Sequence, residues 1–416
     1  MRPGNDSLRI ALLTYRGHPH SGGQGVYVRY LSRALVELGH RVEVFAGQPF
    51  PVLDEGIALT PLPSLDLYRP EDPFRRPARD EFRDWIDVLE YGLMCTAAFP
   101  EPLSFSLRVA RELRSRVQDF DVVHDNQCLG YGLLEVAKRM PTVATVHHPI
   151  SLDRQVDLRK AATKGRRAAL KRWYGFTRMQ SRVARRLPKL LTVSDSARGD
   201  IVREFKADPR SVSVVHNGVD AELFRPLPRM QRVPGRVITV ASADLPIKGL
   251  SFLLEAIAKL KTERDVELVV VGKGGMSRGP RELAHRYGIG DAVRFEGSVD
   301  SLRLVELYAE AQVAVVPSLY EGFSLPAIEA MSCAVPLVTT TGGALPEVVG
   351  ADGEAGWLVP PGDASALASA IGSMLDEDVL RERLGRAGRR RTLSRFTWNA
   401  SASQTAALYR EVQASC

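Results

Sequence analysis

The sequence repeats one pattern twice: a short apolar run, a glycine-containing loop, and then an amphipathic stretch with helical spacing. The first copy begins at residues 8–14 and the second at residues 237–241. Continuous apolar runs of this length are typical of strands that are buried on both faces, and such strands alternate with helices in parallel α/β sheets. The pattern therefore predicts two Rossmann-like, doubly wound α/β domains.

A length of 416 residues agrees with two domains of roughly 200 residues each. We expect the first domain to cover residues 1–215 and the second residues 216–395, with residues 396–416 forming a helix that packs back on the first domain. Residues 48–102 are rich in proline and charge and indicate an elaborated connection. Parallel sheets bind ligands at the carboxyl ends of their strands, so we expect the domains to face each other across a cleft.

Composition excludes several classes of protein. The chain is 44% hydrophobic and 25% charged, as globular proteins are. No apolar run approaches the roughly 20 residues of a membrane span, and the first seven residues do not resemble a signal peptide, so we expect a cytoplasmic protein. The four cysteines have neither CxxC spacing nor a neighbouring histidine cluster, which argues against a disulfide framework and against structural zinc.

The net charge of +7 is unevenly distributed. Basic residues recur throughout residues 154–189, where Asp157 is the only acid. A solvated helix surface and a surface for anionic membranes both explain such a segment. We hypothesise that it docks the first domain on the inner membrane face and presents a lipid-linked acceptor. Its few aromatic residues show no stacking pattern, which argues against a nucleic-acid partner.

The most informative stretch is Ser318–Glu329, SLYEGFSLPAIE, which follows an apolar run and opens a helix. Backbone N–H groups of Ser324 and Leu325 are then free at a helix N-terminus, where anions bind. Glu321 and Glu329 flank this anion site, and we interpret them as ligands for sugar and ribose hydroxyls. A helix-capping Glu329 and a surface Glu321 are the simpler alternative for either residue alone.

Glu321-Gly322-Phe323-Ser324-Leu325-Pro326 with Glu329 resembles the E-x7-E signature of family four retaining glycosyltransferases, which have the GT-B fold. Other stretches are similar to motifs of that family and follow its order along nearly the whole chain: Gly22-Gly23-Gln24-Gly25, Asn217-Gly218-Val219-Asp220, Gly342-Gly343 with Pro346-Glu347, and residues 353–361.

The resemblance implies a role for each matching residue. Glu329 would bind the donor's ribose, Glu321 the transferred sugar, and the backbone of Ser324 and Leu325 the diphosphate. His147 matches a histidine that contacts the donor sugar; a core role is its alternative, and His148 is equally open to both. The remaining candidates for donor or acceptor contact are Gly23, Gly25, Asn217, Gly218 and Phe323.

Lys248 matches the family's diphosphate-binding lysine. The sequence departs from the family pattern at Ser242-Ala243-Asp244, because Ala243 stands where an arginine often contacts the phosphates. Either Lys248 and the helix N-terminus suffice, or another cation such as Lys273 or an arginine of the basic segment substitutes.

The resemblance implies a retaining hexosyltransferase that needs no metal and no cofactor beyond a nucleotide-sugar co-substrate. Its acceptor would be a glycan, a lipid or a small molecule of cell-envelope polysaccharide or glycolipid synthesis. In the family's proposed route the departing diphosphate accepts the acceptor's proton on the same face of the sugar. A nucleotide-sugar epimerase on the same fold and a catalytically silent nucleotide-sugar or lipid-binding scaffold remain alternatives. The sequence leaves the nucleotide base, the sugar, the acceptor and the oligomeric state open.

Overall fold

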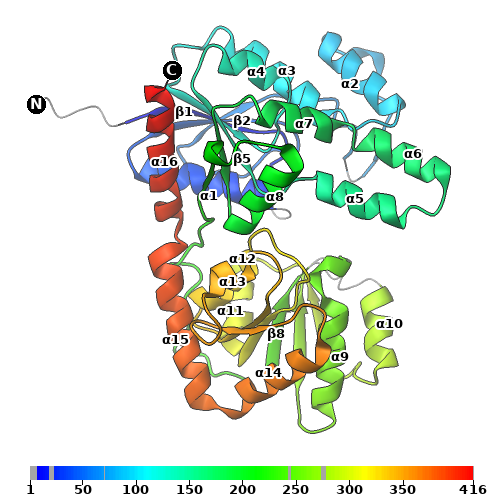
Figure 1. The fold of residues 1–416 in the computed structure, drawn as a ribbon, viewed down its shortest axis with the longest axis vertical. Coiled ribbons are helices and arrows are strands. Elements are labelled where there is room, and N and C mark those ends of the chain that lie inside the picture. The colour runs from blue at the N-terminus through cyan, green and yellow to red at the C-terminus, as the bar shows by residue number, and fades with distance from the viewer. Residues whose placement is uncertain (1–6, 18–22, 70, 242–244, 273–277, 416) are drawn as a thin grey trace, which may run out of the picture. The chain divides into compact units, whose positions relative to one another are not determined.

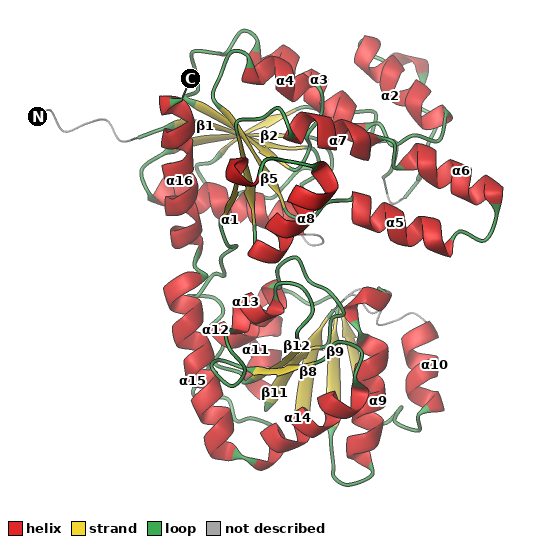
Figure 2. Cartoon of the chain, in the orientation of Figure 1, coloured by secondary structure: helices red, strands yellow, loops and turns green. Residues whose placement is uncertain are grey.

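The structure is a computed structural model that describes residues 7–17, 23–69, 71–241, 245–272 and 278–415. The chain divides into two compact units. The first consists of Met1–Val193, Ala197–Val215 and Ser401–Cys416, and the second of Ser194–Ser196 and His216–Ala400. Each unit is built on a parallel sheet with flanking helices (Figures 1 and 2).

The sheet of the first unit has the strand order β3-β2-β1-β4-β5-β6-β7, and its neighbouring strands run parallel. Its strands are β1 (Arg9–Thr14), β2 (Arg41–Ala46), β3 (Ala58–Pro61), β4 (Val122–Asn126), β5 (Thr142–Val146), β6 (Lys189–Thr192) and β7 (Val212–Val214). The order reverses between β1 and β4, which is the point where doubly wound sheets bind ligands.

The helices beside this sheet are α1 (Gly23–Glu37), α2 (Trp85–Cys95), α3 (Glu101–Leu113), α4 (Gly132–Ala137), α5 (Ser151–Lys160), α6 (Lys164–Trp173), α7 (Phe176–Ala184), α8 (Asp195–Phe205) and α16 (Trp398–Ala414). Short 3-10 turns lie at η1 (Arg79–Glu81) and η2 (Pro209–Ser211). The segment expected to be an elaborated connection, residues 48–102, therefore contains an edge strand and a well-formed helix. Its many charged residues interrupt the apolar periodicity by which strands and helices are predicted from a sequence.

The sheet of the second unit has the order β10-β9-β8-β11-β12-β13 and is again parallel. Its strands are β8 (Arg236–Val240), β9 (Glu267–Val271), β10 (Val293–Gly297), β11 (Val313–Val316), β12 (Leu337–Thr340) and β13 (Trp357–Val359). Its helices are α9 (Leu250–Lys261), α10 (Arg278–Arg286), α11 (Ser301–Glu310), α12 (Leu325–Ser332), α13 (Leu345–Val349), α14 (Ala364–Asp376) and α15 (Asp378–Arg395), with the turn η3 (Pro246–Lys248). The order reverses between β8 and β11.

The side chains of β11 point alternately to the two faces of the second sheet, and each face carries its own apolar cluster. Val313 and Val315 of β11 belong to a cluster with α9 and α14. Ala314 and Val316 point to the other face and join a cluster with α11, α12 and α13. Because successive side chains of a strand face opposite sides, a continuous apolar run is what a strand covered by helices on both faces requires.

The C-terminal helix α16 contacts the sheet of the first unit. The hydroxyl of Tyr409 lies 2.6 Å from Nδ1 of His124 in β4. The ammonium of Lys189 lies 2.7 Å from a carboxylate oxygen of Glu411. None of the described helices combines the length and apolar character that crossing a bilayer would require.

Candidate functional site

The loops after β8 and β11 meet at the switch point of the second sheet. Leu319 donates a backbone hydrogen bond of 2.8 Å to the carbonyl of Ile247. Gly249 has a φ of +71°, and a Cβ there would lie 1.9 Å from the carbonyl oxygen of Pro317. Only glycine allows this backbone approach. Gly249 thus holds its neighbour Lys248, the last residue of η3, beside the loop that follows β11.

Lys248 and Glu321 form an ion pair across these two loops. The Lys248 ammonium donates to both carboxylate oxygens of Glu321, at 2.8 and 3.0 Å. The Ser318 hydroxyl donates to the same carboxylate at 2.7 Å. The Glu321 side chain is 10% exposed and that of Lys248 30%. Since an ammonium has three hydrogens, one remains for an anionic ligand.

The N-terminus of α12 directly follows this pair. Ser324 caps the helix, because its hydroxyl accepts the N–H of Ala327 at 3.4 Å. The first N–H groups of a helix have no partner within it, and the helix dipole places a partial positive charge there. The N–H of Leu325, the first helical residue, is such a group. The lysine and the helix end together make this edge of the sheet suited to a phosphate group.

The Gly342-Gly343 pair holds the backbone of Glu321. Ala344 donates its N–H to the carbonyl of Glu321 at 2.8 Å. Gly343 has a φ of +65°, and a Cβ there would lie 2.2 Å from the same carbonyl oxygen. The glycine motif after β12 therefore positions a residue of the loop after β11.

Glu329 lies one turn into α12, partly exposed. The Tyr308 hydroxyl donates to its carboxylate at 3.4 Å and to the carbonyl of Pro326 at 3.2 Å. Burial of the carboxyl group raises the pKa of Glu329 to about 7, which the hydrogen bond from Tyr308 opposes. Its carboxyl group is thus half protonated near neutral pH.

Phe323 and Gly218 pack against neighbouring segments of the second unit. The Phe323 ring stacks on His216 with centroids 6.0 Å apart and meets Phe396 edge to face at 5.8 Å. A Cβ on Gly218 would lie 2.2 Å from the backbone nitrogen of Trp398, so this glycine lets two chain segments touch. The buried Oδ1 of Asn217 has no hydrogen-bonding partner within the described residues.

His147 follows β5 in the first unit. Its Nε2 lies 2.7 Å from Oδ1 of Asn126, and its backbone N–H donates to Oε1 of Gln127 at 2.6 Å. The ring of Tyr27 meets the imidazole edge to face, with centroids 4.6 Å apart. Burial lowers the pKa of His147 to about 4, so the ring is neutral at physiological pH. With Nε2–H donating to Asn126, Nδ1 is left as the acceptor nitrogen of the neutral ring.

The first unit also contains the candidate glycines of α1 and two further histidines, His124 and His148. Gly23 and Gly25 lie in the first turn of α1, where the amide of Asn126 donates to the carbonyl of Gln24 at 3.3 Å. His124 is fully buried and bonded at both ring nitrogens, to Tyr409 and Thr145, which gives it a structural role. Nε2 of His148 lies 3.2 Å from Asp153.

One charged pair at the carboxyl ends of the strands of the first sheet was not predicted from the sequence. Arg16 follows β1 and forms a bidentate ion pair with the buried carboxylate of Glu101. Its guanidinium group lies 5.4 Å from the ring of Phe99 and 5.9 Å from that of Tyr68. Burial raises the pKa of Glu101 to about 7. The position of Arg16 directly after the first strand was the signal that could have identified it.

Ala243, Lys273 and Gly22 lie outside the described residues. Across the ranges that the structure does describe, no three histidine, cysteine, aspartate or glutamate side chains gather as a metal site requires.

Two family models match the chain. Residues 21–223 match the model described as Glycosyltransferase Family 4, and residues 232–391 match the model described as Glycosyl transferases group 1. A protein from Mycolicibacterium hassiacum, named MMP alpha-(1->4)-mannosyltransferase, is 53% identical over 404 residues, which cover 97% of this chain and 98% of the relative. D-inositol 3-phosphate glycosyltransferase 2 from Catenulispora acidiphila is 30% identical, over 96% of this chain and 94% of the relative.

Solved structures agree in fold. Sucrose-phosphate synthase from Thermosynechococcus elongatus superposes with a TM-score of 0.74 at 24% identity, over 98% of this chain and 100% of its own. Anabaena Alr3699/HepE in complex with UDP and glucose gives a TM-score of 0.69 at 18% identity, over 97% and 100%. The two parallel-sheet units and these neighbours confirm the GT-B fold predicted from the sequence.

Proposed function

The chain belongs to the group 1 glycosyltransferases and is a hexosyltransferase, and we propose that within this family it is a retaining, metal-independent mannosyltransferase. The observation that carries the proposal is the Lys248–Glu321 pair beside the N-terminus of α12. Cationic and dipolar groups at such a position would stabilise the charge that develops on a diphosphate leaving group.

The donor's diphosphate would bind Lys248 and the amide of Leu325. Two hydrogens of the ammonium are held by Glu321, so its remaining hydrogen has a fixed direction. A charge-assisted hydrogen bond is worth roughly 1.5–3 kcal/mol. The same contacts strengthen as the sugar–phosphate bond breaks, and this differential binding is what accelerates transfer.

The sugar and the ribose would bind carboxylates. Glu321 keeps lone pairs free on Oε2 for a hydroxyl of the transferred hexose, while Ser318 occupies Oε1. Glu329 in its ionised form would accept the two ribose hydroxyls. His147, neutral at physiological pH, would accept a sugar hydroxyl at Nδ1. We further propose that the departing diphosphate takes the acceptor's proton, so that the anomeric configuration of the donor is retained.

The sugar is proposed from the similarity to the mannosyltransferase of M. hassiacum. We propose a nucleotide-diphosphate mannose as donor and a glycan with an accepting 4-hydroxyl as acceptor. The test incubates the purified protein with GDP-mannose, UDP-glucose, ADP-glucose and UDP-N-acetylglucosamine, with short mannosides as acceptors, and measures nucleotide release and product linkage. Release from GDP-mannose with an α-(1→4) product is expected. Turnover only with a glucose donor would contradict mannosyl transfer but would agree with the proposed phosphate site.

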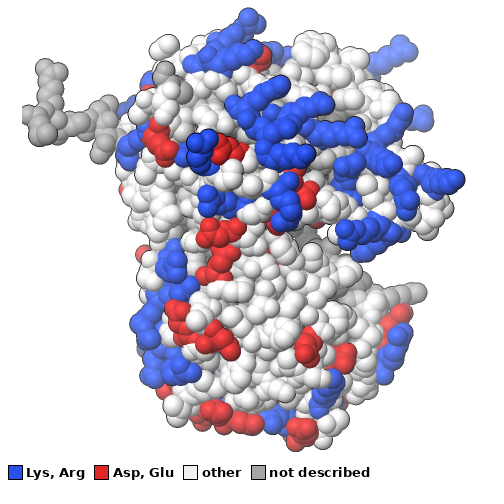
Figure 3. All heavy atoms as spheres, in the orientation of Figure 1, with Lys and Arg blue, Asp and Glu red and all other residues white. Residues whose placement is uncertain are grey.

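We also propose that the basic surface of α5, α6 and α7 contacts anionic membranes. Lysines and arginines gather over these helices on the face in Figure 3, and those of α6 and α7 are exposed: Lys164, Arg166, Arg167, Lys171, Arg172, Arg178 and Arg182. Such a surface binds anionic lipid through screened charge. Sedimentation with phosphatidylglycerol vesicles that is lost in 0.5 M salt is expected, and no sedimentation at low salt would refute the contact.

A further inference from the structure

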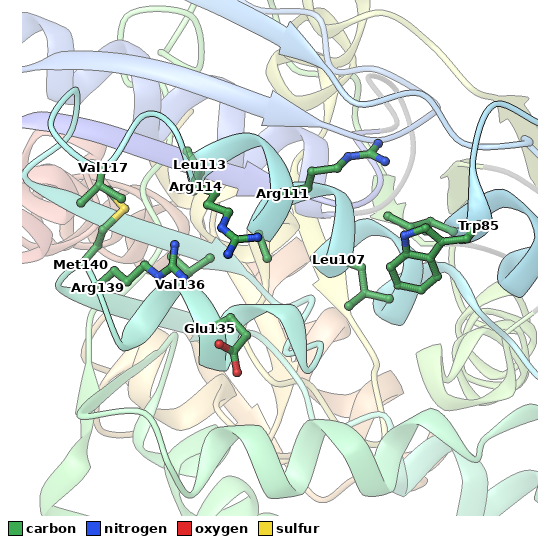
Figure 4. A pocket seen from close by; sticks show the side chains of 12 residues that line it. Trp85, Leu107, Arg111, Leu113, Arg114, Val117, Glu135, Val136, Arg139 and Met140 are labelled. Atoms are coloured by element: carbon green, nitrogen blue, oxygen red, sulfur yellow. The ribbon is translucent and has the colours of Figure 1, made fainter.

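A pocket lies between α2, α3 and α4 of the first unit, away from the carboxyl ends of the strands (Figure 4). Its volume is about 340 Å³, within the range of pockets that hold small molecules. Val117 precedes β4 and Met140 precedes β5, and both line it, so the pocket opens at the amino-terminal edge of the sheet. It is therefore separate from His147 and Arg16, which follow the carboxyl ends of their strands.

The floor of this pocket is apolar. Val136 and Met140 are buried beneath it, and Leu107 and Ala110 of α3 form its wall. Trp85, the first residue of α2, closes one end and keeps 62% of its surface exposed. An exposed tryptophan beside a hollow of this kind is an apolar surface available for a ligand.

The opposite end of the pocket is cationic. Figure 4 shows the guanidinium groups of Arg114 and Arg139 directed into the same half of the pocket, with Leu107 and Trp85 in the other half. Neither guanidinium has a hydrogen-bonding partner within the described residues, whereas the third lining arginine, Arg111, is bonded to Asp84.

Glu135 is the only acid among the described residues that line the pocket. Glu135 is bonded to Lys138 at 2.7 Å, and the pKa of Glu135 is lowered first by this hydrogen bond and then by the charges of Lys138 and Arg139. Because Lys138 pairs with Glu135, the net charge of this end stays positive through Arg114 and Arg139. The pocket thus combines two uncommitted guanidinium groups with an apolar floor and an aromatic end.

We propose that this pocket binds a single amphipathic anion, a phosphate monoester or carboxylate carried on a short apolar chain. The anionic head would lie between Arg114 and Arg139, which match oxyanions in charge and in their planar arrangement of donors. The chain would lie over Val136 and Leu107 toward Trp85. This site is independent of the proposed transfer reaction.

The experiment compares four probes by calorimetry below their micelle concentrations: octyl phosphate, octanol, octylamine and inorganic phosphate. Octyl phosphate should bind saturably with one site per chain and change the fluorescence of Trp85. Octanol, octylamine and inorganic phosphate should each bind at least about tenfold more weakly, because each lacks one half of the recognised chemistry.

The double variant Arg114→Gln/Arg139→Gln should weaken the binding of octyl phosphate by about tenfold or more and leave the binding of octanol unchanged. Its matched control is Arg76→Gln/Arg79→Gln, two exposed arginines of the same unit that do not line the pocket. The fluorescence response should disappear in Trp85→Phe. Equal affinity for octanol and octyl phosphate, or unchanged binding in the double variant, would overturn the proposal. So would binding to anionic vesicles without binding of monomeric octyl phosphate, since that indicates a membrane surface.

Discussion

The ammonium of Lys248 lies 2.8 and 3.0 Å from the two carboxylate oxygens of Glu321, although 73 residues separate the two in the chain. The pair joins the loops that follow β8 and β11, where the strand order of the second sheet reverses. It therefore fixes a cation at the position where doubly wound sheets bind phosphates.

Lys248→Ala should lower the rate of transfer by about 10²–10³-fold, because it removes a preorganised charge from the leaving group. Nucleotide release under saturating donor measures this effect. The fold should stay intact, but the melting temperature should fall, because the mostly buried carboxylate of Glu321 loses its counter-ion. Lys259→Ala in α9 is the control: that lysine forms an ion pair with a carboxylate, Glu255, but is exposed on a helix surface. Turnover close to wild type in Lys248→Ala would refute the phosphate assignment.

Glu321→Gln tests whether the pair acts as a unit. The amide keeps a hydrogen-bond acceptor for Ser318 but no longer anchors the ammonium by charge, so we expect a loss of about tenfold or more in turnover. In the double variant with Lys248→Ala the two losses should be less than additive, because the second substitution removes a partner already lost. Strictly additive losses, measured as kcat/KM, would mean that the two residues contact the donor independently.

Glu329 should make donor binding depend on pH. Its pKa of about 7 lies above the usual 4.5, so the carboxyl group is protonated below neutrality and would accept ribose hydroxyls poorly there. Nucleoside diphosphate affinity, measured by calorimetry, should rise up to about tenfold between pH 6 and pH 8 and then level off. Glu329→Gln should abolish the dependence. A wild-type affinity that falls over this interval would contradict the assignment.

The raised pKa of Glu329 should also make the free energy of unfolding fall as the pH rises, whereas donor affinity rises. The folded state holds the proton of Glu329 more tightly than the unfolded chain does. Its contribution to stability is therefore fully present below about pH 4.5 and is lost as the pH rises to about 7. Relative to wild type, Glu329→Gln should be more stable at pH 8 than at pH 5, as measured by urea unfolding at both values.

The central strands and the helix after Phe323 were predictable because local signals specify them. Apolar runs mark the strands β8, β9 and β11, and Ser324 with Pro326 marks the start of α12. These signals lie within a few residues of one another, so they can be recognised from the sequence without the structure.

Charged residues that are buried by partners from another helix could not be predicted in this way. In α2 and α3, the guanidinium of Arg108 bonds to Asp87 and Glu90, and all three side chains are at most 4% exposed. In a linear sequence each looks like a surface residue, because only the packing of the two helices supplies its partner. Lys248 and Glu321 were each predicted as site residues, but their contact was not, because 73 residues separate them in the chain and only the fold brings them together.

Gly218→Ala should destabilise the second unit by about 2 kcal/mol or more, because the new Cβ would lie 2.2 Å from the backbone nitrogen of Trp398 and must displace it. Thermal unfolding measures the loss. Gly199→Ala in α8 is the matched control: no atom lies within 4 Å of its added Cβ, and alanine in a helix gains about 0.5–1 kcal/mol over glycine. The two substitutions should therefore shift the melting temperature in opposite directions. A harmless Gly218→Ala would mean that the Asn217-Gly218 motif serves ligand contact and not the junction with residues 397–398.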